Sequence, residues 1–389
     1  MRKLLAPACA ALGLLLAACG GAAAPAPSTP ASSPVAPASP ASSSPAAKPA
    51  AASGAASASA KPAASGAASA SAAAKPAAAG TANVKVGASW SSFTQMPFLY
   101  AVEKGYFAKQ GISMEQVTIQ SDQTIAPLST NQIQVGATGF GVSLYNAAQR
   151  DIPVLMAADN GSATGTSSGA IVIRKALAGQ IKDYKDFKGK KVALSSTGTS
   201  IHVTLAKALQ AGGLTFKDID LVTIPFGDMP AALTNGAVDA ALLTEPAISK
   251  GVADGSQAVF KWSDEIYPNQ QFNAVMYSPQ FAKTDTAKGF MTAYMQGVRD
   301  YNDVIRGKAN MDEFARIGAK YLPVKDPAIY KSVRQIGINP DGKLQLGPMQ
   351  EDIDFYIKDG LMKDKPDLTK LVDNSFVDAA LKDLGPYKG

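Results

Sequence analysis

Residues 191–211 read KVALSSTGTSIHVTLAKALQA, a run that contains an apolar strand, a loop of hydroxyl residues and a helix. A short apolar run such as 191–194 is typical of a buried strand, and the residues after the loop are apolar at helical spacing. The same order occurs upstream, where 84–88 alternates, 89–95 is polar and aromatic, and a helix is predicted to begin near Pro97. The predicted fold class is therefore α/β.

This unit recurs along the chain. Further strands are predicted at 114–120, 133–138, 154–157, 170–173, 219–224 and 237–243, and further helices at 124–129, 142–150 and 229–235. Alternating strands and helices predict an open parallel sheet with helices on both faces, and ligand sites at the carboxyl ends of the strands.

Two lobes are expected, because the pattern restarts after Gly169. The predicted first lobe is discontinuous and comprises 84–169 and 274–389, and the second comprises 170–273. From Thr286 onward apolar residues recur at helical spacing, so we expect these helices to pack on an existing lobe.

The first 18 residues have the pattern of a secretory signal. Arg2 and Lys3 precede an apolar stretch over 4–16, which is too short to span a bilayer. The stretch ends in LAACG at 16–20, which resembles a bacterial lipobox, where cleavage before the cysteine leaves a lipidated first residue. We therefore expect a lipoprotein signal peptide at 1–18 and lipidation of Cys19; an ordinary signal peptide is the alternative.

Residues 19–82 are predicted to be a disordered tether. Of the 63 residues from 20 to 82, 57 are Ala, Pro, Ser or Gly. A segment with almost no large apolar side chains cannot offset the entropy lost on ordering.

Charge and cysteine content exclude several classes of protein. The chain has 37 basic and 31 acidic residues, but five of the basic ones and no acidic one lie in 1–82, so the rest holds 32 against 31. This balance lacks the basic excess of a nucleic-acid-binding domain. Cys9, Cys19 and His202 are the only cysteines and histidine, so disulfide scaffolds, Cys/His zinc sites and Fe–S sites are excluded after residue 82. We predict no metal and no cofactor.

Three stretches resemble one family. The first is PFLYAVEKGYF at 97–107 with QGI at 110–112. The second is FKGKKVALSSTGTS at 187–200, followed by GL at 213–214, DI at 218–219, PAALTNGAVDA at 230–240 and EP at 245–246. The third is LVDNSF at 371–376, which is similar to the family's final helix. Over about 84–389 the chain resembles the substrate-binding proteins of nitrate, sulfonate and taurine type ABC importers, which include relatives that bind thiamine-precursor pyrimidines. LSTNQIQ at 128–134 departs from the family's pattern, because the expected glycine and aspartate are absent.

The resemblance implies a type II periplasmic-binding fold, with a hinge and two lobes that close on a small ligand and present the closed form to a membrane permease. It implies a monomer without enzymatic activity. Closure driven by a ligand requires contacts with both lobes, since only a difference in affinity between open and closed states shifts their equilibrium.

Loops at the carboxyl ends of predicted strands supply candidate ligand contacts in both lobes. They are Ser89, Trp90, Ser91, Asp122, Gln123, Thr138, Gly139 and Phe140 in the first, and Ser195, Ser196, Thr197, Gly198, Thr199, Phe226, Thr244 and Glu245 in the second. The loop at 195–200 precedes a helix, so its hydroxyls and backbone N–H groups suit a sulfonate, carboxylate or phosphate oxygen.

Each of these assignments has a structural alternative. The 195–200 loop is also a plausible N-cap, and Trp90 and Phe140 form either an aromatic wall or part of the core. Glu245 either touches ligand or braces the hinge. We expect Asp228 to cap a helix and His202 to be a packed or surface helix residue.

Two kinds of enzyme compete with a receptor. GTSSG at 165–169 matches the GxSxG pattern of serine hydrolases, but it precedes a strand, whereas a nucleophile elbow follows one. An enzyme of pyrimidine or cofactor biosynthesis with this fold is the other alternative; export argues against it, because such enzymes use cytosolic pools.

The sequence thus predicts an extracytoplasmic, lipid-anchored solute-binding protein of an ABC importer. The donor-rich loop at 195–200 favours a small anion, whereas the aromatic residues and the absence of Arg and Lys in the candidate loops favour a neutral or weakly anionic organic molecule. We therefore expect a small organic solute of sulfonate, carboxylate or heteroaromatic type rather than bare nitrate.

Overall fold

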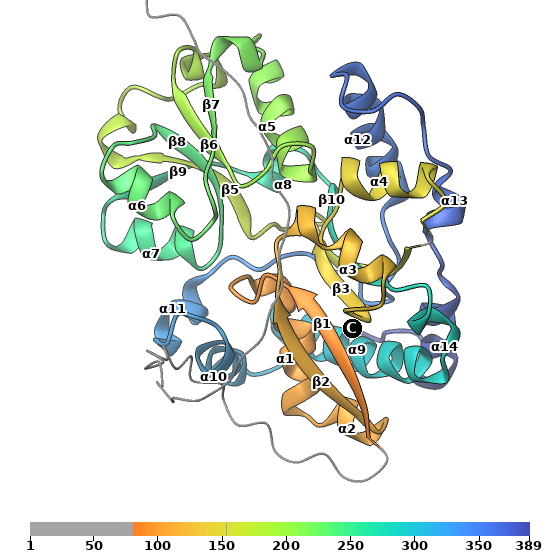
Figure 1. The fold of residues 1–389 in the computed structure, drawn as a ribbon. Coiled ribbons are helices and arrows are strands. Elements are labelled where there is room, and N and C mark those ends of the chain that lie inside the picture. The colour runs from red at the N-terminus through yellow and green to blue at the C-terminus, as the bar shows by residue number, and fades with distance from the viewer. Residues whose placement is uncertain (1–80, 153) are drawn as a thin grey trace, which may run out of the picture. The chain divides into compact units, whose positions relative to one another are not determined.

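The computed structural model describes residues 81–152 and 154–389, whose strands form two five-stranded sheets (Figure 1). The predicted signal peptide, Cys19 and nearly all of the predicted tether lie outside the described residues. No helix in the described part is long and apolar enough to cross a membrane.

The first sheet has the order β2-β1-β3-β10-β4. Its strands are β1 (Ala82–Ala88), β2 (Ile112–Thr118), β3 (Val135–Gly139), β4 (Leu155–Ser162) and β10 (Gln271–Tyr277). β1 pairs in parallel with β2 and β3, whereas β10 runs antiparallel to β3 and β4.

The second sheet has the order β7-β6-β8-β5-β9. Its strands are β5 (Gly169–Arg174), β6 (Lys191–Leu194), β7 (Asp220–Thr223), β8 (Ala240–Thr244) and β9 (Gln257–Trp262). β6 pairs in parallel with β7 and β8, whereas β5 runs antiparallel to β8 and β9.

The prediction of parallel sheets is therefore wrong, because each sheet contains one reversed strand. β5 begins where β8 ends, with Gly169 opposite Thr244, and β10 begins near the end of β3, with Asn273 opposite Gly139. Each connection between the sheets, 163–168 and 263–270, thus runs from the carboxyl edge of one sheet to the carboxyl edge of the other, where the reversed strand begins. The carboxyl edges of the two sheets consequently lie next to both connections, which is where an open α/β sheet binds its ligand.

Strands β9 and β10 are absent from the prediction. Their sequences, QAVFKW and QFNAVMY, contain polar residues that interrupt an apolar run, so neither shows clean alternation. Most of β10 is nevertheless buried, because it lies between two other strands.

The helices are α1 (Met96–Glu103), α2 (Tyr106–Lys109), α3 (Ile125–Ser129), α4 (Val142–Gln149), α5 (Ser200–Ala211), α6 (Met229–Thr234), α7 (Ala247–Ala253), α8 (Ser263–Ile266), α9 (Asp285–Ile305), α10 (Met311–Tyr321), α11 (Pro327–Ser332), α12 (Leu346–Lys358), α13 (Leu368–Leu371) and α14 (Ser375–Leu384). Helices α1, α9, α10 and α14 share one apolar cluster with the first sheet, and α4 and α12 share a second cluster with it. The C-terminal helices thus pack on the first sheet, as predicted.

Strand β5 shows why the second sheet is covered on both faces. Ile171 and Ile173 belong to one apolar cluster with α5, and Ala170 and Val172 belong to another with α6. Successive side chains of a strand point to opposite faces, so a continuous apolar run requires a helix layer on each.

One predicted helix is displaced. The stretch 371–376 is not a single helix, since α13 ends at Leu371 and α14 begins at Ser375. Val372 pairs with Met156 beside β4, and Asp373 Oδ1 accepts a hydrogen bond from the Ser375 N–H at 2.9 Å. Pairing with β4 extends the backbone between the two helices.

Candidate functional site

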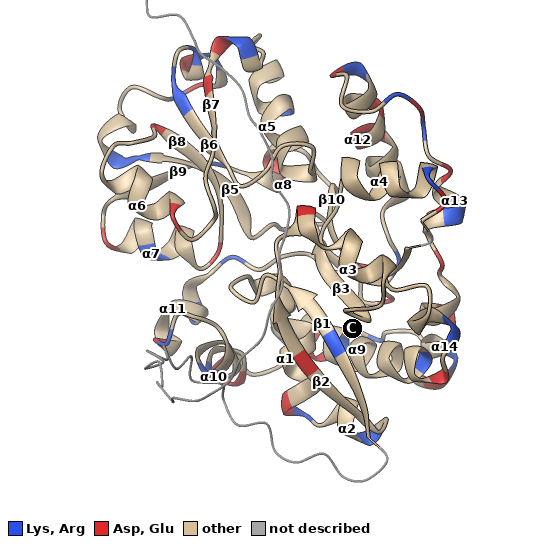
Figure 2. Ribbon diagram, viewed as in Figure 1, with Lys and Arg blue, Asp and Glu red and all other residues tan. Residues whose placement is uncertain are grey.

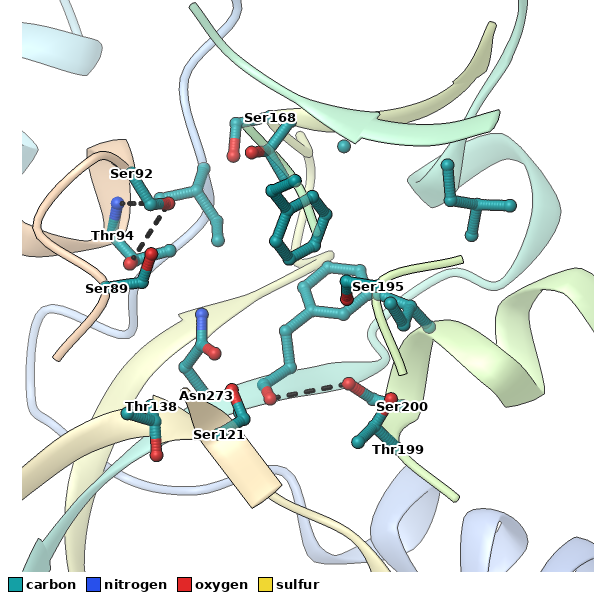
Figure 3. Close-up of a pocket in the computed structure, with 18 of the residues that line it drawn as sticks. Ser89, Ser92, Thr94, Ser121, Thr138, Ser168, Ser195, Thr199, Ser200 and Asn273 are labelled. Carbon is teal, nitrogen blue, oxygen red and sulfur yellow. Dashed lines mark hydrogen bonds between the residues drawn. The ribbon is translucent and has the colours of Figure 1, made fainter. Parts of the chain in front are cut away.

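A cavity of about 110 Å³ lies at the carboxyl edges of both sheets. Figure 3 shows its labelled side chains, which come from strands of the first sheet, from loops and turns next to both sheets, and from the start of α5. Its volume is below the range of about 300 to 1,000 Å³ that is common for drug-sized ligands, so the cavity suits a small solute.

Hydroxyl residues are the most numerous residues in the lining, although most of its surface is apolar. Of the residues that line the cavity, ten are serines, four are threonines and two are the amides Gln95 and Asn273; none is charged. Most of the others are apolar, among them Phe226, Phe272 and Ile336. Figure 2 shows Lys, Arg, Asp and Glu mainly on the outer helices and loops. The cavity therefore offers many neutral hydrogen-bonding groups beside an apolar surface.

Nine predicted ligand contacts line this cavity: Ser89, Ser91, Thr138, Gly139, Ser195, Ser196, Thr199, Phe226 and Thr244. They belong to segments far apart in the sequence, and they meet because each lies at the carboxyl end of a strand or in the loop that follows one.

The loop before α5 leaves the start of that helix without a side-chain cap. Gly198 has φ +70°, a left-handed conformation that favours glycine. Thr199 is the N-cap by position, but its side chain makes no capping hydrogen bond; its Oγ1 donates to the Ser196 carbonyl at 3.3 Å. The first N–H groups of α5 thus have no side-chain partner from the cap, which favours the ligand-binding interpretation over a plain N-cap.

A short helix that follows β1 of the first sheet also borders the cavity. Ser92 caps the short helix Phe93–Gln95, and its Oγ accepts hydrogen bonds from the Thr94 N–H at 3.4 Å and from Thr94 Oγ1 at 3.2 Å. Ser92, Thr94 and Gln95 all line the cavity, directly before α1.

Trp90 and Phe140 do not line the cavity. Trp90 is 9% exposed, packs edge-on against Phe98 with the ring centroids 6.3 Å apart, and donates from Nε1 to the Val117 carbonyl at 3.2 Å. Phe140 is 3% exposed and packs edge-on against Tyr145. Both rings have the core packing that was the alternative to an aromatic wall; the aromatic lining comes from Phe226 and Phe272.

Asp122, Gln123, Thr197 and Gly198 also lie outside the cavity lining. Asp122 and Gln123 are in the turn Ser121–Gln123, of which only Ser121 lines the cavity. Gly198 instead contacts the first residue of α4, because its carbonyl accepts a hydrogen bond from the Val142 N–H at 2.9 Å.

Glu245 braces the connection between the sheets. It is 1% exposed, does not line the cavity, and accepts hydrogen bonds from Ser249 Oγ at 2.7 Å, the Ser249 N–H at 2.9 Å and the Arg334 N–H at 3.3 Å. Burial raises the pKa of the carboxyl, while the accepted hydrogen bonds act to lower it. Arg334 in turn forms an ion pair with Asp264, with 2.6 Å between Nη2 and Oδ2.

His202 is a packed helix residue. It is 4% exposed, its ring lies 4.5 Å from that of Phe216, and Nδ1 accepts a hydrogen bond from the Gly198 N–H at 3.2 Å. Burial lowers the pKa of the imidazole, so the neutral form is favoured. With Nδ1 occupied as an acceptor, the proton of the neutral ring lies on Nε2. Asp228, the predicted cap of α6, is the N-cap residue but makes no side-chain capping bond.

Several lining residues are absent from the sequence prediction, Ser92, Thr94, Gln95, Ser167, Ser168, Ser263, Phe272 and Asn273 among them. Ser200 also lines the cavity and belongs to the predicted loop at 195–200, and Ser121 directly precedes the predicted contact Asp122. Ser167 and Ser168 lie in the GTSSG pentad, which connects β4 to β5. A serine-rich segment between the two predicted lobes was the sequence feature that could have identified Ser167 and Ser168. No comparable feature indicated Asn273, because its strand was not predicted.

The departure from the family pattern at 128–134 has a local explanation. Asn131 has φ +58° at the place of the expected glycine, and asparagine tolerates this left-handed conformation better than most residues. Gln134 stands near the place of the aspartate, where its Oε1 accepts a hydrogen bond from the Lys85 N–H at 3.0 Å and its Nε2 donates to the Asn131 carbonyl at 2.9 Å.

Comparison with known proteins agrees with this architecture. A protein of Bacillus subtilis (strain 168) named as an aliphatic sulfonates-binding protein is 26% identical over 302 residues, which cover 74% of this chain and 85% of the relative.

Two solved structures share the fold. The periplasmic nitrate-binding protein NrtA from Synechocystis PCC 6803 matches with a TM-score of 0.64 and 15% identity over 78% of this chain and 89% of its own. The periplasmic aliphatic sulphonate binding protein SsuA from Escherichia coli matches with a TM-score of 0.58 and 20% identity over 75% of this chain and 92% of its own. The described part thus has the periplasmic-binding-protein fold predicted from the sequence.

The family model described as NMT1/THI5 like matches residues 92–303, more than half of the chain. This span contains α1, the loop before α5 and most of the residues that line the cavity. The chain belongs to the NMT1/THI5-like family.

Proposed function

We propose that this chain is the solute-binding component of an ABC importer and captures a small organic solute between two closing lobes. The observation that carries the proposal is the cavity at the carboxyl edges of both sheets, lined from each by neutral polar groups. A molecule held there contacts both sheets, so it stabilises the closed arrangement more than an open one.

The lining favours a solute of sulfonate, carboxylate or heteroaromatic type. The first turn of α5 has no side-chain cap, so its unpaired N–H groups are available to an oxyanion, and the surrounding hydroxyls add further donors. No lysine or arginine lines the cavity, so nothing there balances a second negative charge. Phe226 and Phe272 provide an apolar surface for the rest of the molecule.

In the proposed receptor one lobe comprises residues 84–162 with 271–389 and the other comprises residues 169–262, because β10 (Gln271–Tyr277) pairs within the first sheet and β5 starts at Gly169. These bounds differ by a few residues from those expected from the sequence. The backbone connections at 163–168 and 263–270 act as the hinge between them. Glu245 and Arg334 lie beside these connections and hold them through the hydrogen bonds described above.

The proposal includes no catalysis. Serines line the cavity, but His202 is the chain's one histidine, lies outside the lining, and accepts a hydrogen bond at Nδ1. Activation of a serine requires a base in contact with its hydroxyl. Ser167, the central serine of the GTSSG pentad, instead has its Oγ near the backbone of Gly169.

The proposed receptor is anchored outside the cytoplasm by lipid on Cys19. Several acyl chains on one residue exceed what stable membrane attachment requires. Mass spectrometry of the mature protein tests this part: an unmodified Cys19 would contradict it.

A thermal-shift screen against sulfonates, carboxylates, nitrate and pyrimidines tests the binding function. A ligand at 100 times its dissociation constant adds about 2.7 kcal/mol to the free energy of unfolding. The bound molecule is then released by denaturation and identified by mass spectrometry. Recovery of a chemically altered molecule would refute a receptor, and no shift with any class would refute the proposed ligand class.

A further inference from the structure

His202, the one histidine of the chain, makes a hydrogen bond that holds the loop before α5. It lies in the first turn of α5, and its Nδ1 accepts a hydrogen bond from the Gly198 N–H at 3.2 Å. This bond closes the loop back onto the helix that follows it. Ser195, Ser196 and Thr199 of the same loop line the cavity, so His202 influences the cavity wall although its own side chain lies outside the lining.

Gly198 is also the residue through which this loop contacts α4. Its carbonyl accepts a hydrogen bond from the Val142 N–H at 2.9 Å, and the next residue, Thr199, forms a bridge with Gly141. Gly198 therefore takes part in two hydrogen bonds, one with α5 and one with α4. A shift of its backbone away from His202 affects both bonds.

The ring of His202 is held in place by packing. It is 4% exposed, and its centroid lies 4.5 Å from the ring of Phe216 and 5.6 Å from the ring of Phe355 on α12. A neutral imidazole has one acceptor nitrogen, whereas the protonated ring has two N–H donors and no acceptor. Protonation therefore places a donor on Nδ1 opposite the Gly198 N–H. Because the ring lies between two aromatic side chains, the loop is the part that moves.

Burial is the main influence on the protonation of His202. It lowers the pKa of the imidazole, while the negative charge of Asp359 at the end of α12 acts to raise it. The loop at 195–199 carries no charged side chain, and Lys207 of α5 pairs with Glu351 of α12 at 2.9 Å. The other charged or titratable residues on the elements packed against the ring are Lys217 and Asp218 beside Phe216, and Asp352 and Lys358 on the face of α12 that contains Phe355. The ring is therefore neutral at pH 7 and takes up a proton only in acid.

We propose that neutral His202 positions the loop before α5, and that protonation of its ring frees the Gly198 backbone from its bonds with α5 and α4. The inference rests on the proposed function, because this loop forms one wall of the proposed solute site. It adds a pH dependence to solute capture: the solute is held at neutral pH and more weakly in acid.

Nuclear magnetic resonance of the full chain without ligand tests this role, because one histidine gives one set of imidazole signals. The ring nitrogen shifts give the tautomer, which we expect to carry its proton on Nε2, and a pH titration gives the pKa. Protection factors, which correct for the intrinsic effect of pH on amide exchange, are then compared about one pH unit above and below this pKa. We expect protection of the Gly198 and Val142 amides to be at least about tenfold lower below the pKa, while the amides of β6 keep theirs.

Two variants separate the hydrogen bond from packing of the ring. His202→Asn keeps an acceptor close to the place of Nδ1 and does not titrate, so it is expected to retain protection of the Gly198 amide at both pH values. His202→Leu has no acceptor and is expected to give low protection at both. Asp352 and the other acids are present in both variants, so a loss of the pH dependence belongs to His202.

Calorimetry with propane-1-sulfonate, which stays ionised throughout, relates the loop to binding. We expect its affinity for the wild type to be at least about threefold lower below the pKa of His202 than above it, and His202→Asn to remove this change. Tighter binding in acid would overturn the proposal, since the charge of the ring rather than the position of the loop would then control affinity.

The outcomes separate this inference from the proposed function. A proton on Nδ1 in the neutral ring, or Gly198 protection that is unchanged when the ring is protonated, overturns the inference and leaves the receptor intact. Absence of propane-1-sulfonate binding at either pH contradicts the sulfonate class of the proposed function, and the exchange result, measured without ligand, then decides the role of His202. The wild-type measurements stand even if a variant fails to fold.

Discussion

Substitution of Gly141 by alanine tests whether the contact between the two lobes belongs to the ligand-bound state. Gly141 precedes α4, and it forms an antiparallel bridge with Thr199 in the loop before α5. A Cβ atom on Gly141 would lie 2.1 Å from the Gly198 carbonyl oxygen and 2.9 Å from Thr199 Cα. With φ at 169°, Gly141 has an extended backbone that alanine also adopts, so the substitution acts through this contact alone.

The size of the effect follows from the clash. Cβ atoms are essentially never closer than 3.0 Å to such neighbours, so the two backbones must separate by about 1 Å. Separation breaks the 2.9 Å hydrogen bond from the Val142 N–H to the Gly198 carbonyl. Losing this bond and leaving its groups unpaired costs about 2 to 4 kcal/mol in the closed arrangement. Ligand affinity is then expected to fall by about 30- to 1,000-fold.

Calorimetry with a ligand identified by the screen measures this change. Gly179→Ala is the matched control, because a Cβ atom there meets nothing within 4 Å and its φ is not left-handed. We expect the control to bind as the wild type and both variants to remain folded by circular dichroism. Wild-type affinity in Gly141→Ala would refute the reasoning, since the lobes would then bind ligand without this contact.

Three further predictions concern stability. Trp90→Ala is expected to lower the free energy of unfolding by about 3 to 5 kcal/mol in urea, because the ring is buried against Phe98; a near-normal stability with lost binding would instead indicate a ligand contact. Arg334→Gln is expected to cost about 1 to 2 kcal/mol through the loss of its pairing with Asp264, and a double-mutant cycle with Asp264→Asn that proves additive would contradict that coupling. Burial raises the pKa of the Asp352 carboxyl to about 8. Between about pH 4 and pH 8 the folded state therefore holds a proton that the unfolded chain releases. The free energy of unfolding then decreases by up to about 1.4 kcal/mol for each unit of increase in pH. Asp352→Asn removes this dependence, so its stability relative to the wild type is expected to increase from pH 4.5 to 7.5 in urea titrations; a difference independent of pH would contradict the buried proton.

Local patterns predicted the elements that carry strong periodicity. The run at 191–211 became β6, the hydroxyl loop and α5, and the apolar spacing after Thr286 became α9. The predicted parallel direction of all strands was wrong, because the side-chain pattern of a buried strand is the same whichever way its neighbours run. The reversal of β5 and β10 follows from how the chain crosses twice between the sheets.

The candidate site was predicted in part for the same reason. Loops after predicted strands identified Ser89, Thr138 and Ser195, since the carboxyl ends of parallel strands share an edge. Trp90 and Phe140 satisfy the same positional rule, yet their rings turn into the core. Burial of a side chain depends on what packs against it, which neighbouring residues in the sequence do not specify.

The sequence by itself determined the α/β class, the hydroxyl-rich loop before α5 and the near neutrality of the part after residue 82, because these depend on residue type and local spacing. The tertiary structure decided which side chains share the cavity. Gln95, Ser168, Ser263 and Asn273 come from four separate segments and meet only because two connections join the carboxyl edges of the sheets. Long-range pairing brings them together, and no local pattern encodes it.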